Sequence, residues 1–397
     1  MRVVDAGAVL GAVVVVASAL VACAPPAPPV PLVAGPEVSV TTVLDGLAKP
    51  WDVVEAPDGA ILTGERSGRF VVLRPDGSTG EVAADLVDLF AAGETGLMGI
   101  ALSRDFASNR TLFTCQGHQD PGGAGSVTGR LDTSSADGAG RDVRVVSWTV
   151  DEGWTQLTRG ADVLTGLPVT STGRHGGCRV FAHPDGTLYI GTGDSTSPTA
   201  PQDPASLGGK VLHVNVDGTP AAGNPDPARP VFTLGHRNVQ GLALQPGTGR
   251  LYGIEQGTRA DDEVNLLSAG SNYGYRPDRR PAVYDESVPM TDPDRVPGAV
   301  AAVWSSGAPT IATPGGTFLD DATWGPWAGT LVVTSQQERK LVLLRLADDG
   351  LSVTEQAVAL EGQFGRLRSV TLASDGALLV TTDNGAADKV LRVTPTS

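Results

Sequence analysis

The stretch PDGTLYIGTGDS, residues 184–195, places a tight turn before a short apolar strand that ends in a polar residue. Asp-Gly supplies the backbone dihedrals that a hairpin turn requires. Residues 188–190 are of the apolar and aromatic types that fill short buried strands. The stretch therefore predicts a β-hairpin whose strand ends at Asp194.

The same unit recurs along the chain, as PDGAILTGERSG (57–68), DFASNRTLFTCQG (105–117), PGTGRLYGIEQG (246–257), GPWAGTLVVTSQQ (325–337) and SDGALLVTTDNG (374–385). Hairpins that repeat at spacings of tens of residues favour a β-propeller over a sandwich. We therefore expect an all-β, six-bladed β-propeller with long loop insertions around residues 117–145 and 275–305. Propellers commonly bind ligands at one face, where we expect the polar strand ends to gather: Glu65, Gln116, Asp194, Gln256, Gln337 and Asp383.

The first residues indicate export. A mostly apolar run over residues 6–21 ends at Leu-Val-Ala-Cys, which resembles a bacterial lipoprotein signal. We expect residues 1–22 to be a signal peptide and Cys23 to be lipidated, with an uncleaved membrane anchor as the alternative. The Pro/Ala-rich segment 23–38 is typical of an extended spacer, which leaves residues 39–397 as the folded domain. The protein would then be exported to the cell envelope and held on the outer face of the membrane by its lipid alone.

The amino-acid composition limits the kinds of partner that we expect the protein to bind. Acidic residues outnumber basic ones by 44 to 29, for a formal net charge of −15. Nucleic-acid binding rests on basic patches, so no nucleic-acid partner is expected. Beyond Cys23 two cysteines remain, Cys115 and Cys178. Two cysteines of an exported protein can pair, although their spacing leaves this open.

A histidine and an acid stand close in sequence. His175 lies in the loop RHGGCR, and Asp194 ends the next predicted hairpin. A loop histidine taken alone is more often a surface group. In a propeller, however, both residues could lie at the same end of one blade. The acid would then fix the imidazole tautomer and leave the other ring nitrogen free to take a proton. His183 and His213 fit structural roles instead.

Three arginines are candidates for anion binding. Arg237 and Asn238 lie in a polar turn of LGHRNVQGLAL, and Arg366 and Arg368 stand two apart in FGRLRSV, on one side of an extended segment. Each motif alone fits solvated charge. Together, aimed at one channel, the guanidinium groups would bind a ligand with several carboxylates.

The segment IEQGTRADDEVNLLSAGSNYGY, residues 254–275, clusters Asp261, Asp262 and Glu263. Acids and backbone carbonyls in a turn-rich loop suit calcium, although the EF-hand spacing is absent and a solvated acidic loop is the alternative. No zinc signature, nucleophile elbow or glycine-rich dinucleotide fingerprint is present.

Taken in order, these motifs resemble the soluble pyrroloquinoline-quinone (PQQ) sugar dehydrogenases, the glucose/sorbosone and aldose dehydrogenase family. The resemblance covers essentially the whole chain after the spacer, through LAKPWDVVEAPDGAILTGERSGR, GETGLMGIALSRDFASNR, HGGCRVFAHPDGTLYIGTGD, LGGKVLHVNVDG, GHRNVQGLAL, EQGTRADDEVNLLSAGSNYGY and GRLRSV. It implies a six-bladed propeller with PQQ and calcium on the channel axis.

The resemblance also implies roles. His175 would take the proton from the anomeric hydroxyl of an aldose while hydride passes to the quinone, Asp194 would orient the imidazole, and Arg237 would stabilise developing charge. The implied cofactor-binding residues are Glu94, Arg237, Asn238, Gln337, Arg366 and Arg368. Carbonyls of Gly257 and Thr258 would hold a catalytic calcium, and Glu263 and Tyr273 would serve a second, structural one.

Three positions depart from the family pattern. Thr258 stands where the family has proline, Gln337 where it has a lysine near the cofactor, and Thr313-Pro314 where it has Pro-Ser. We therefore predict an exported quinoprotein that oxidises an aldose to its lactone, with its sugar and its electron acceptor left open. The alternatives are a non-catalytic propeller lipoprotein that binds a sugar or a protein, and a calcium-dependent lactonase.

Overall fold

The computed structural model describes residues 30–120 and 140–396, and almost all of their regular structure is β-strand. The helices in this part of the chain are the single turn α1 (Phe106–Asn109) and the 3-10 segments η1 (Ala200–Gln202) and η2 (Ala322–Trp327). None of them has the length and apolarity needed to cross a membrane. The predicted signal peptide and Cys23 lie outside the described residues.

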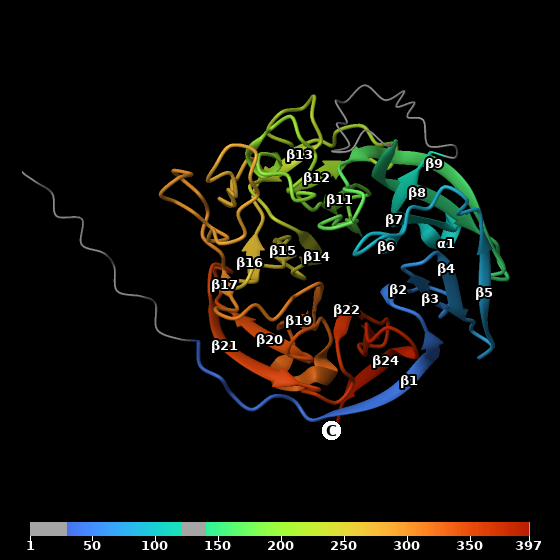
Figure 1. Ribbon diagram of the computed structural model, residues 1–397. Helices are drawn as coiled ribbons and strands as arrows, with labels where there is room; N and C mark the ends of the chain where they lie inside the picture. Colours follow the sequence, from blue (N-terminus) through green and yellow to red (C-terminus); the bar gives the residue numbers. More distant parts are fainter. Residues whose placement is uncertain (1–29, 121–139, 397) are drawn as a thin grey trace, which may run out of the picture.

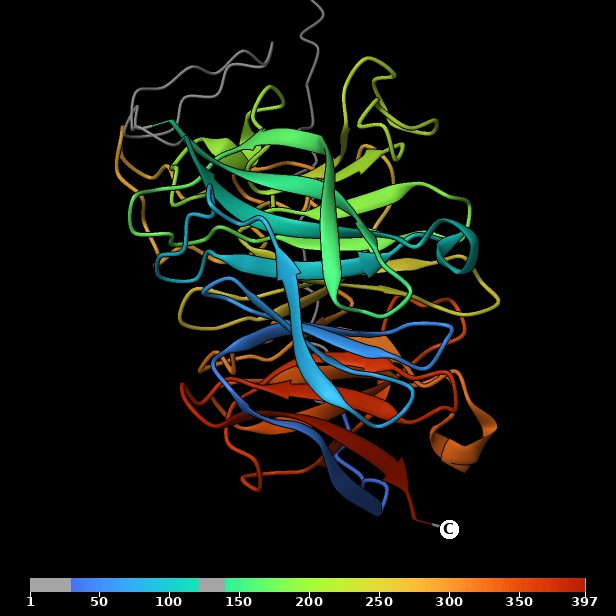
Figure 2. The same cartoon turned by 90° about the vertical axis from the view of Figure 1, so that its right-hand side faces the viewer.

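The strands form four sheets of four strands and one sheet of eight. In spatial order the eight-stranded sheet contains β2 (Pro50–Glu55), β3 (Ile61–Glu65), β4 (Arg69–Leu73), β5 (Thr79–Ala84), β9 (Gln156–Leu167), β8 (Arg141–Val150), β7 (Thr111–Gln119) and β6 (Leu97–Leu102). Its two antiparallel halves are joined by a short parallel pairing of β5 with β9 at Ala83–Gln156 and Ala84–Leu157. Figure 2 shows β5, in light blue, running from one half to the other.

The remaining sheets follow in chain order. They are β10 (Arg179–Ala182), β11 (Leu188–Gly191), β12 (Lys210–Val214) and β13 (Val231–Leu234); β14 (Val239–Leu244), β15 (Leu251–Glu255), β16 (Glu263–Leu266) and β17 (Trp304–Ser305); and β18 (Gly316–Phe318), β19 (Leu331–Ser335), β20 (Lys340–Leu346) and β21 (Val353–Ala359). The last sheet combines β22 (Leu367–Leu372), β23 (Leu378–Thr382) and β24 (Asp388–Pro395) with β1 (Val38–Leu47).

The sheets are arranged as a propeller ring (Figure 1). The first strand of each four-strand group faces the centre, and β2, β6, β10, β14, β18 and β22 contact one another in a closed cycle. The ring is closed by β1, which pairs antiparallel with β24 from Val38–Pro395 onward. The two ends of the described chain thus share one sheet, so the ring cannot open without breaking that ladder.

The sequence repeat coincides with one position in every sheet. The strands predicted from the recurring unit are β3, β7, β11, β15, β19 and β23, each the second strand from the centre. The all-β prediction is therefore confirmed. The same strands are buried along most of their length, as β3 and β15 are at every residue, because each sheet packs between two others.

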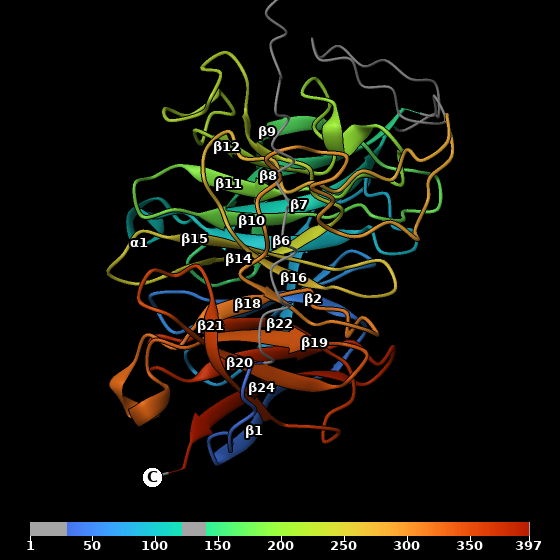
Figure 3. The ribbon, with the colours of Figure 1, turned by 90° about the vertical axis from the view of Figure 1, so that its left-hand side faces the viewer.

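Hydrophobic cores fill the spaces between neighbouring sheets. One cluster joins Phe113 and Val145 of the eight-stranded sheet to Val180 and Leu212 of the next sheet. Long connections stay outside these cores. Figure 3 shows the segment 275–305, in yellow-orange, on the side of the ring opposite to α1 and η2.

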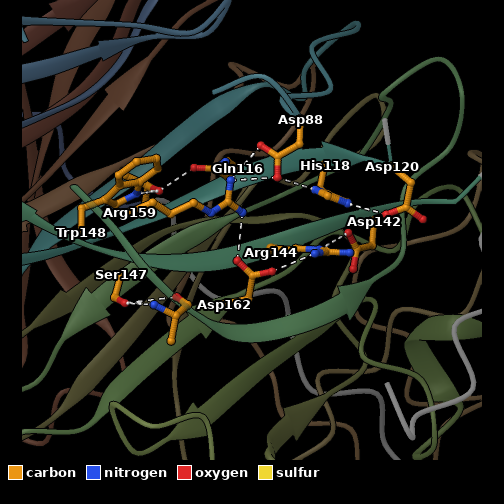
Figure 4. Close-up of polar contacts among 12 residues, drawn as sticks. Asp88, Gln116, His118, Asp120, Asp142, Arg144, Ser147, Trp148, Arg159 and Asp162 are labelled. Carbon is orange, nitrogen blue, oxygen red and sulfur yellow. Dashed lines mark hydrogen bonds and ion pairs between the residues drawn. The ribbon is translucent and has the colours of Figure 1, made fainter. Parts of the chain in front are cut away.

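A charged network covers one face of β7, β8 and β9 (Figure 4). The His118 ring nitrogens lie 2.9 Å from Asp88 and 3.1 Å from Asp120, and Arg159 donates to Asp88 at 2.8 Å. Gln116, which we expected at a strand end, lies beside this network because β7 continues to Gln119.

Cys115 of β7 and Cys178, just before β10, form a disulfide with their Cα atoms 5.9 Å apart. The bond links residues that are 63 positions apart in the chain. It ties the eight-stranded sheet to the segment that carries His175.

The inner strands meet in a buried cluster that consists of Trp51, Asp52, Arg179, Arg368 and Ser369, which we call the inner-strand cluster. The Asp52 carboxylate pairs with Arg179 and accepts a hydrogen bond from Ser369 Oγ at 2.5 Å. The guanidinium groups of Arg179 and Arg368 lie 4.7 Å and 4.5 Å from the Trp51 ring. Strands β2, β10 and β22 are thereby fixed to one another at the centre of the ring.

We predict that Asp52→Ala destabilises the protein by about 3–5 kcal/mol, because it leaves the buried Arg179 without its carboxylate. The measurement is chemical denaturation followed by fluorescence. Asp45→Ala, at an exposed position, is the matched control and should change the unfolding free energy by less than about 0.5 kcal/mol. Equal midpoints for the two variants would show that the pair does not hold the centre together.

Candidate active site

His175 and Asp194 form a buried pair. His175 Nδ1 lies 2.8 Å from Asp194 Oδ1, and both side chains are almost fully buried. The loop before β10 brings the histidine to the end of the hairpin strand because Ser195 N donates to the His175 carbonyl. Gly193 is required at this contact, since a Cβ there would lie 1.9 Å from the His175 carbonyl oxygen.

Arg237 determines which nitrogen of His175 carries the proton. Its Nη2 lies 2.8 Å from His175 Nε2. A guanidinium can only donate, so Nε2 accepts and the ring proton sits on Nδ1, where it is donated to Asp194. The single lone pair of Nε2 is therefore directed at Arg237 Nη2, and it becomes available to a substrate hydroxyl when the guanidinium turns to another acceptor. This is the arrangement of a base oriented by a carboxylate.

The end of strand β15 holds Arg237 in place. Its backbone N donates to Glu255 Oε2 at 2.9 Å, and its Nη1 donates to the Gln256 carbonyl at 3.0 Å. The side chain is buried, and its Nε has no hydrogen-bond partner within residues 30–120 and 140–396. One N–H of a buried guanidinium is thus left for a ligand.

Glu94 and Asn238 lie beside this group. Glu94 Oε2 accepts from His175 N at 3.3 Å and from Asn238 Nδ2 at 3.5 Å. The Asn238 amide is fully buried, and in the described part of the chain its Oδ1 meets no donor. The structure therefore brings Glu94, His175, Asp194, Arg237 and Asn238 together at one end of the inner strands.

Arg368 reaches the same region from β22. Its guanidinium donates to Gln240 Oε1 at 3.2 Å and pairs with Asp383 at 3.4 Å. Burial lowers its pKa to about 10, and its Nε is another buried donor with no partner among the described residues. Arg366 is half-buried and contacts Asn384 and Asp383 through its backbone. A register shift after Leu367 breaks the simple two-residue alternation expected for this pair.

The end of β19 presents Gln336 rather than Gln337. Gln336 is buried, and its Nε2 donates to Asp383 Oδ2 at 2.6 Å. Gln337 is exposed in the turn that follows. Both glutamines follow β19, which ends at Ser335, and only Gln336 is directed inward.

The loop expected to hold calcium is organised by Asp262. This fully buried carboxylate accepts from Gly257 N at 2.9 Å, Thr310 Oγ1 at 2.8 Å and Ala312 N at 3.0 Å. Its oxygens are therefore occupied, and the half-buried Thr258 lies at the turn that it supports. Among the residues that the structure describes, no group of three or more His, Cys, Asp or Glu side chains has metal-binding geometry.

Glu263, a second predicted ligand, lies behind this loop. Burial, together with the neighbouring Glu255, raises the pKa of Glu263 to about 8. Asn265 Nδ2 donates to Glu263 at 3.2 Å, and Asn265 Oδ1 finds no partner in the described chain. The Tyr273 hydroxyl is bound to the Leu266 carbonyl. Only the main-chain carbonyl of Tyr273 could therefore serve an ion.

Three site residues were missed by sequence reasoning, and all belong to the long insertion after β16. Tyr284 Oη donates to Asp194 Oδ2 at 2.7 Å and lies 2.9 Å from Tyr275 Oη. Glu286 pairs with Arg174 and lies 3.8 Å from Arg237. Tyr275 ends a motif that the sequence analysis singled out for calcium, whereas Tyr284 and Glu286 lie in a stretch without repeat or motif, where only the length of the insertion indicated a role.

Above these side chains a cavity of about 820 Å³ opens to the surface. Its lining joins the insertion to the loops around Glu94 and His175, through residues that include Glu94, Thr196, Arg174, Arg259, Tyr284 and Glu286. Polar and apolar surface both contribute to the wall, and the lining side chains carry both signs of charge. A small hydrophilic molecule could reach the buried base through this opening.

The ring of sheets and the buried base define a β-propeller protein with a candidate ligand site at one end of its inner strands. A family model described as Glucose / Sorbosone dehydrogenase matches residues 47–392, and the chain belongs to this family. The resemblance inferred from the motifs is thereby confirmed. Family membership supports an oxidoreductase activity for this site.

Individual relatives agree over nearly the whole length. The chain is 32% identical over 373 residues to the uncharacterised protein slr1608 of Synechocystis, which covers 88% of this chain and 84% of the relative. It is 27% identical over 369 residues to aldose sugar dehydrogenase YliI of Escherichia coli, covering 90% and 93%. The PQQ-bound aldose sugar dehydrogenase of Streptomyces coelicolor superposes with a TM-score of 0.72 at 29% identity, covering 91% and 99%.

Proposed function

We propose that this protein is a PQQ-dependent aldose dehydrogenase that oxidises the anomeric carbon of a sugar to a lactone. The observation that carries the proposal is a set of three buried polar atoms without partners among the described residues, next to an oriented base: Arg237 Nε, Asn238 Oδ1 and Arg368 Nε. Such atoms are costly to bury unless a ligand pairs with them. Counting each half of the eight-stranded sheet as one blade, we infer a six-bladed propeller around this site.

The side chains present fit PQQ. The cofactor carries several carboxylates, and Arg237 and Arg368 offer free guanidinium N–H groups that pair well with carboxylate and quinone oxygens. The guanidinium group of Arg368 also lies over the ring of the buried Trp51, which holds this side chain in place. When bound, PQQ would supply the acceptor for hydride from the sugar carbon.

The residues of the chain would handle the proton. Oxidation at the anomeric carbon removes one hydride from that carbon and one proton from its hydroxyl. His175 Nε2 would take the proton once Arg237 Nη2 gives up this nitrogen to the sugar hydroxyl. Asp194 holds the Nδ1–H and stabilises the imidazolium that forms. Arg237 stands 2.8 Å from Nε2 and places fixed positive charge where negative charge develops on oxygen.

We also propose two calcium sites. The carbonyls of Gly257 and Thr258 would hold an ion beside the cofactor, since Asp262 is committed to backbone donors. The second site would use Glu263 and the Tyr273 carbonyl, with the unpartnered Asn265 Oδ1 as a further oxygen. Calcium prefers such oxygen sets. It would also neutralise the two neighbouring buried carboxylates, Glu255 and Glu263.

We expect His175→Asn to bind PQQ but to lose at least about a hundredfold in turnover, the usual scale of lost general-base catalysis. Protein reconstituted with PQQ and calcium is assayed with an artificial electron acceptor across a panel of aldoses. His183→Asn, which changes a half-exposed histidine outside the site, is the matched control and should retain activity. Verified PQQ binding with no turnover on any sugar, in the unsubstituted protein, contradicts the enzyme. Absence of saturable PQQ binding favours the non-catalytic propeller.

Calcium should bind the quinone-free protein at Glu263 and stabilise it. At a hundredfold excess over Kd the expected gain is about 2.7 kcal/mol, measured by chemical denaturation and by calorimetric titration. Glu263→Gln should abolish this component, whereas Glu152→Gln, at an exposed position, should keep it. An unchanged titration in Glu263→Gln would remove this residue from the ion site.

The same proposal includes export and lipidation at Cys23, after removal of residues 1–22. Cells that express the protein should incorporate labelled palmitate into it, and Cys23→Ser should abolish the label and release the protein from membranes. Cys115→Ser, tested in parallel, removes a cysteine without affecting the anchor. Label that persists in Cys23→Ser would argue for attachment elsewhere.

A further inference from the structure

The insertion after β16 places two tyrosines against the His175–Asp194 pair, and neither has a role in the proposed function so far. Tyr275 is fully buried, its backbone N donates to the Gly235 carbonyl at 2.9 Å, and Gln202 Nε2 donates to its carbonyl at 3.0 Å. Tyr275 is therefore a fixed point of the insertion. Val288 and Met290 complete the small hydrophobic cluster around it.

Tyr284 connects this fixed point to the base. Its hydroxyl lies 2.7 Å from Asp194 Oδ2, 3.3 Å from His175 Nδ1 and 2.9 Å from Tyr275 Oη. The rings of Tyr284 and His175 meet edge to face, with centroids 5.8 Å apart. The two oxygens of Asp194 are thus divided, one facing the imidazole and the other facing the phenol.

The ionised Asp194 carboxylate determines which groups donate and which accept in these hydrogen bonds. An ionised Asp194 can only accept, so Tyr284 donates to it and its oxygen is free to accept from Tyr275. Burial raises the pKa of both phenols, so they remain protonated donors at neutral pH. The result is a chain of donors that runs from Tyr275 through Tyr284 to the rear oxygen of the carboxylate.

We propose that Tyr284 is a positioning residue of the His175–Asp194 pair, held in place by Tyr275. Its hydroxyl fixes the rotation of the carboxylate and takes up part of the negative charge that would otherwise act on the imidazole. The assignment rests on the proposed function of His175 as a base. It gives the long insertion a defined chemical task.

Loss of the Tyr284 hydroxyl changes how strongly Asp194 stabilises the charged form of His175. Without the phenol, Oδ2 of Asp194 loses its side-chain donor, and the carboxylate stabilises the charged imidazole more strongly. The titration midpoint of His175 then rises, so the acidic limb of the kcat/KM profile moves to higher pH. One hydrogen bond to a charged group corresponds to a shift of up to about one pH unit. The charged and titratable groups that face His175 from neighbouring elements are Asp194, Arg237, Glu94 and Tyr284, and in the variant only the last changes.

Two variants and one control test the proposal. Tyr284→Phe should raise the His175 midpoint by about 0.5–1 unit. Tyr275→Phe, which removes the donor to Tyr284 together with a contact to Arg237, should raise it by less. Tyr252→Phe is the matched control, because Tyr252 also loses a single buried hydrogen bond, to the Gly350 carbonyl, but far from the base. It should leave the midpoint unchanged.

The midpoint is measured by NMR of the histidine ring in the quinone-free protein, with His175→Asn used for assignment. The kcat/KM profile of the PQQ- and calcium-loaded enzyme is measured separately. A parallel shift in both readouts supports the proposal, and an unmoved His175 midpoint in a folded Tyr284→Phe overturns it. If Tyr284→Phe does not fold, Tyr275→Phe decides in the same way. An unsubstituted enzyme without turnover contradicts the proposed function, whereas the NMR result still decides the role of Tyr284.

Discussion

The buried pair of Asp52 and Arg179 is the interaction on which the centre of the ring depends. A propeller brings its inner strands so close together that charged side chains there lose their water. In place of water, the Asp52 carboxylate pairs with Arg179 and accepts hydrogen bonds from Ser369 Oγ and the Ile100 amide. These partners come from three other inner strands. Since an unpaired buried charge is costly, the strands can satisfy the carboxylate only in one relative arrangement. The arrangement in turn fixes Trp51 between two guanidinium groups.

The same pair determines where the site lies. Arg179 is the first residue of β10, and its Nε donates to the Gln240 carbonyl of β14 at 2.8 Å. Four residues before Arg179 stands His175, and three residues before Gln240 stands Arg237. The disulfide through Cys178 anchors the short segment between the base and Arg179. A contact made at the centre of the ring thus sets the 2.8 Å approach of the imidazole to the guanidinium. The base geometry is in this sense a property of the fold.

A structural feature could be predicted from the sequence when the residues that encode it are adjacent in the chain. The repeat places one strand in every sheet because a turn and the strand after it are encoded by adjacent residues. His175 and Asp194 stand near one such unit, so their pairing could be anticipated. The burial of Gln336 and the exposure of Gln337 could not be anticipated, because both lie in the turn after β19, where the alternation of a strand no longer indicates which side a residue faces. Tyr284 had no signal of its own. Its position depends on how a 30-residue insertion folds back, and no periodicity encodes that path.

Backbone strain at the site indicates that several contacts hold its loops at once. His175, Ser195 and Thr196 have φ values of +53°, +53° and +55°, in a region that side-chain-bearing residues occupy at a cost of about 1–3 kcal/mol each. Such strain persists only where the surroundings fix the conformation more than once. Here Gly193 permits the close approach of the two loops, and hydrogen bonds cross between them. The rigid strand ends therefore hold the base, while Tyr284 comes from a longer, less constrained connection. Proton handling thus depends on both parts of the chain, because the strand ends hold His175 and Asp194 while the insertion brings the Tyr284 hydroxyl to the carboxylate.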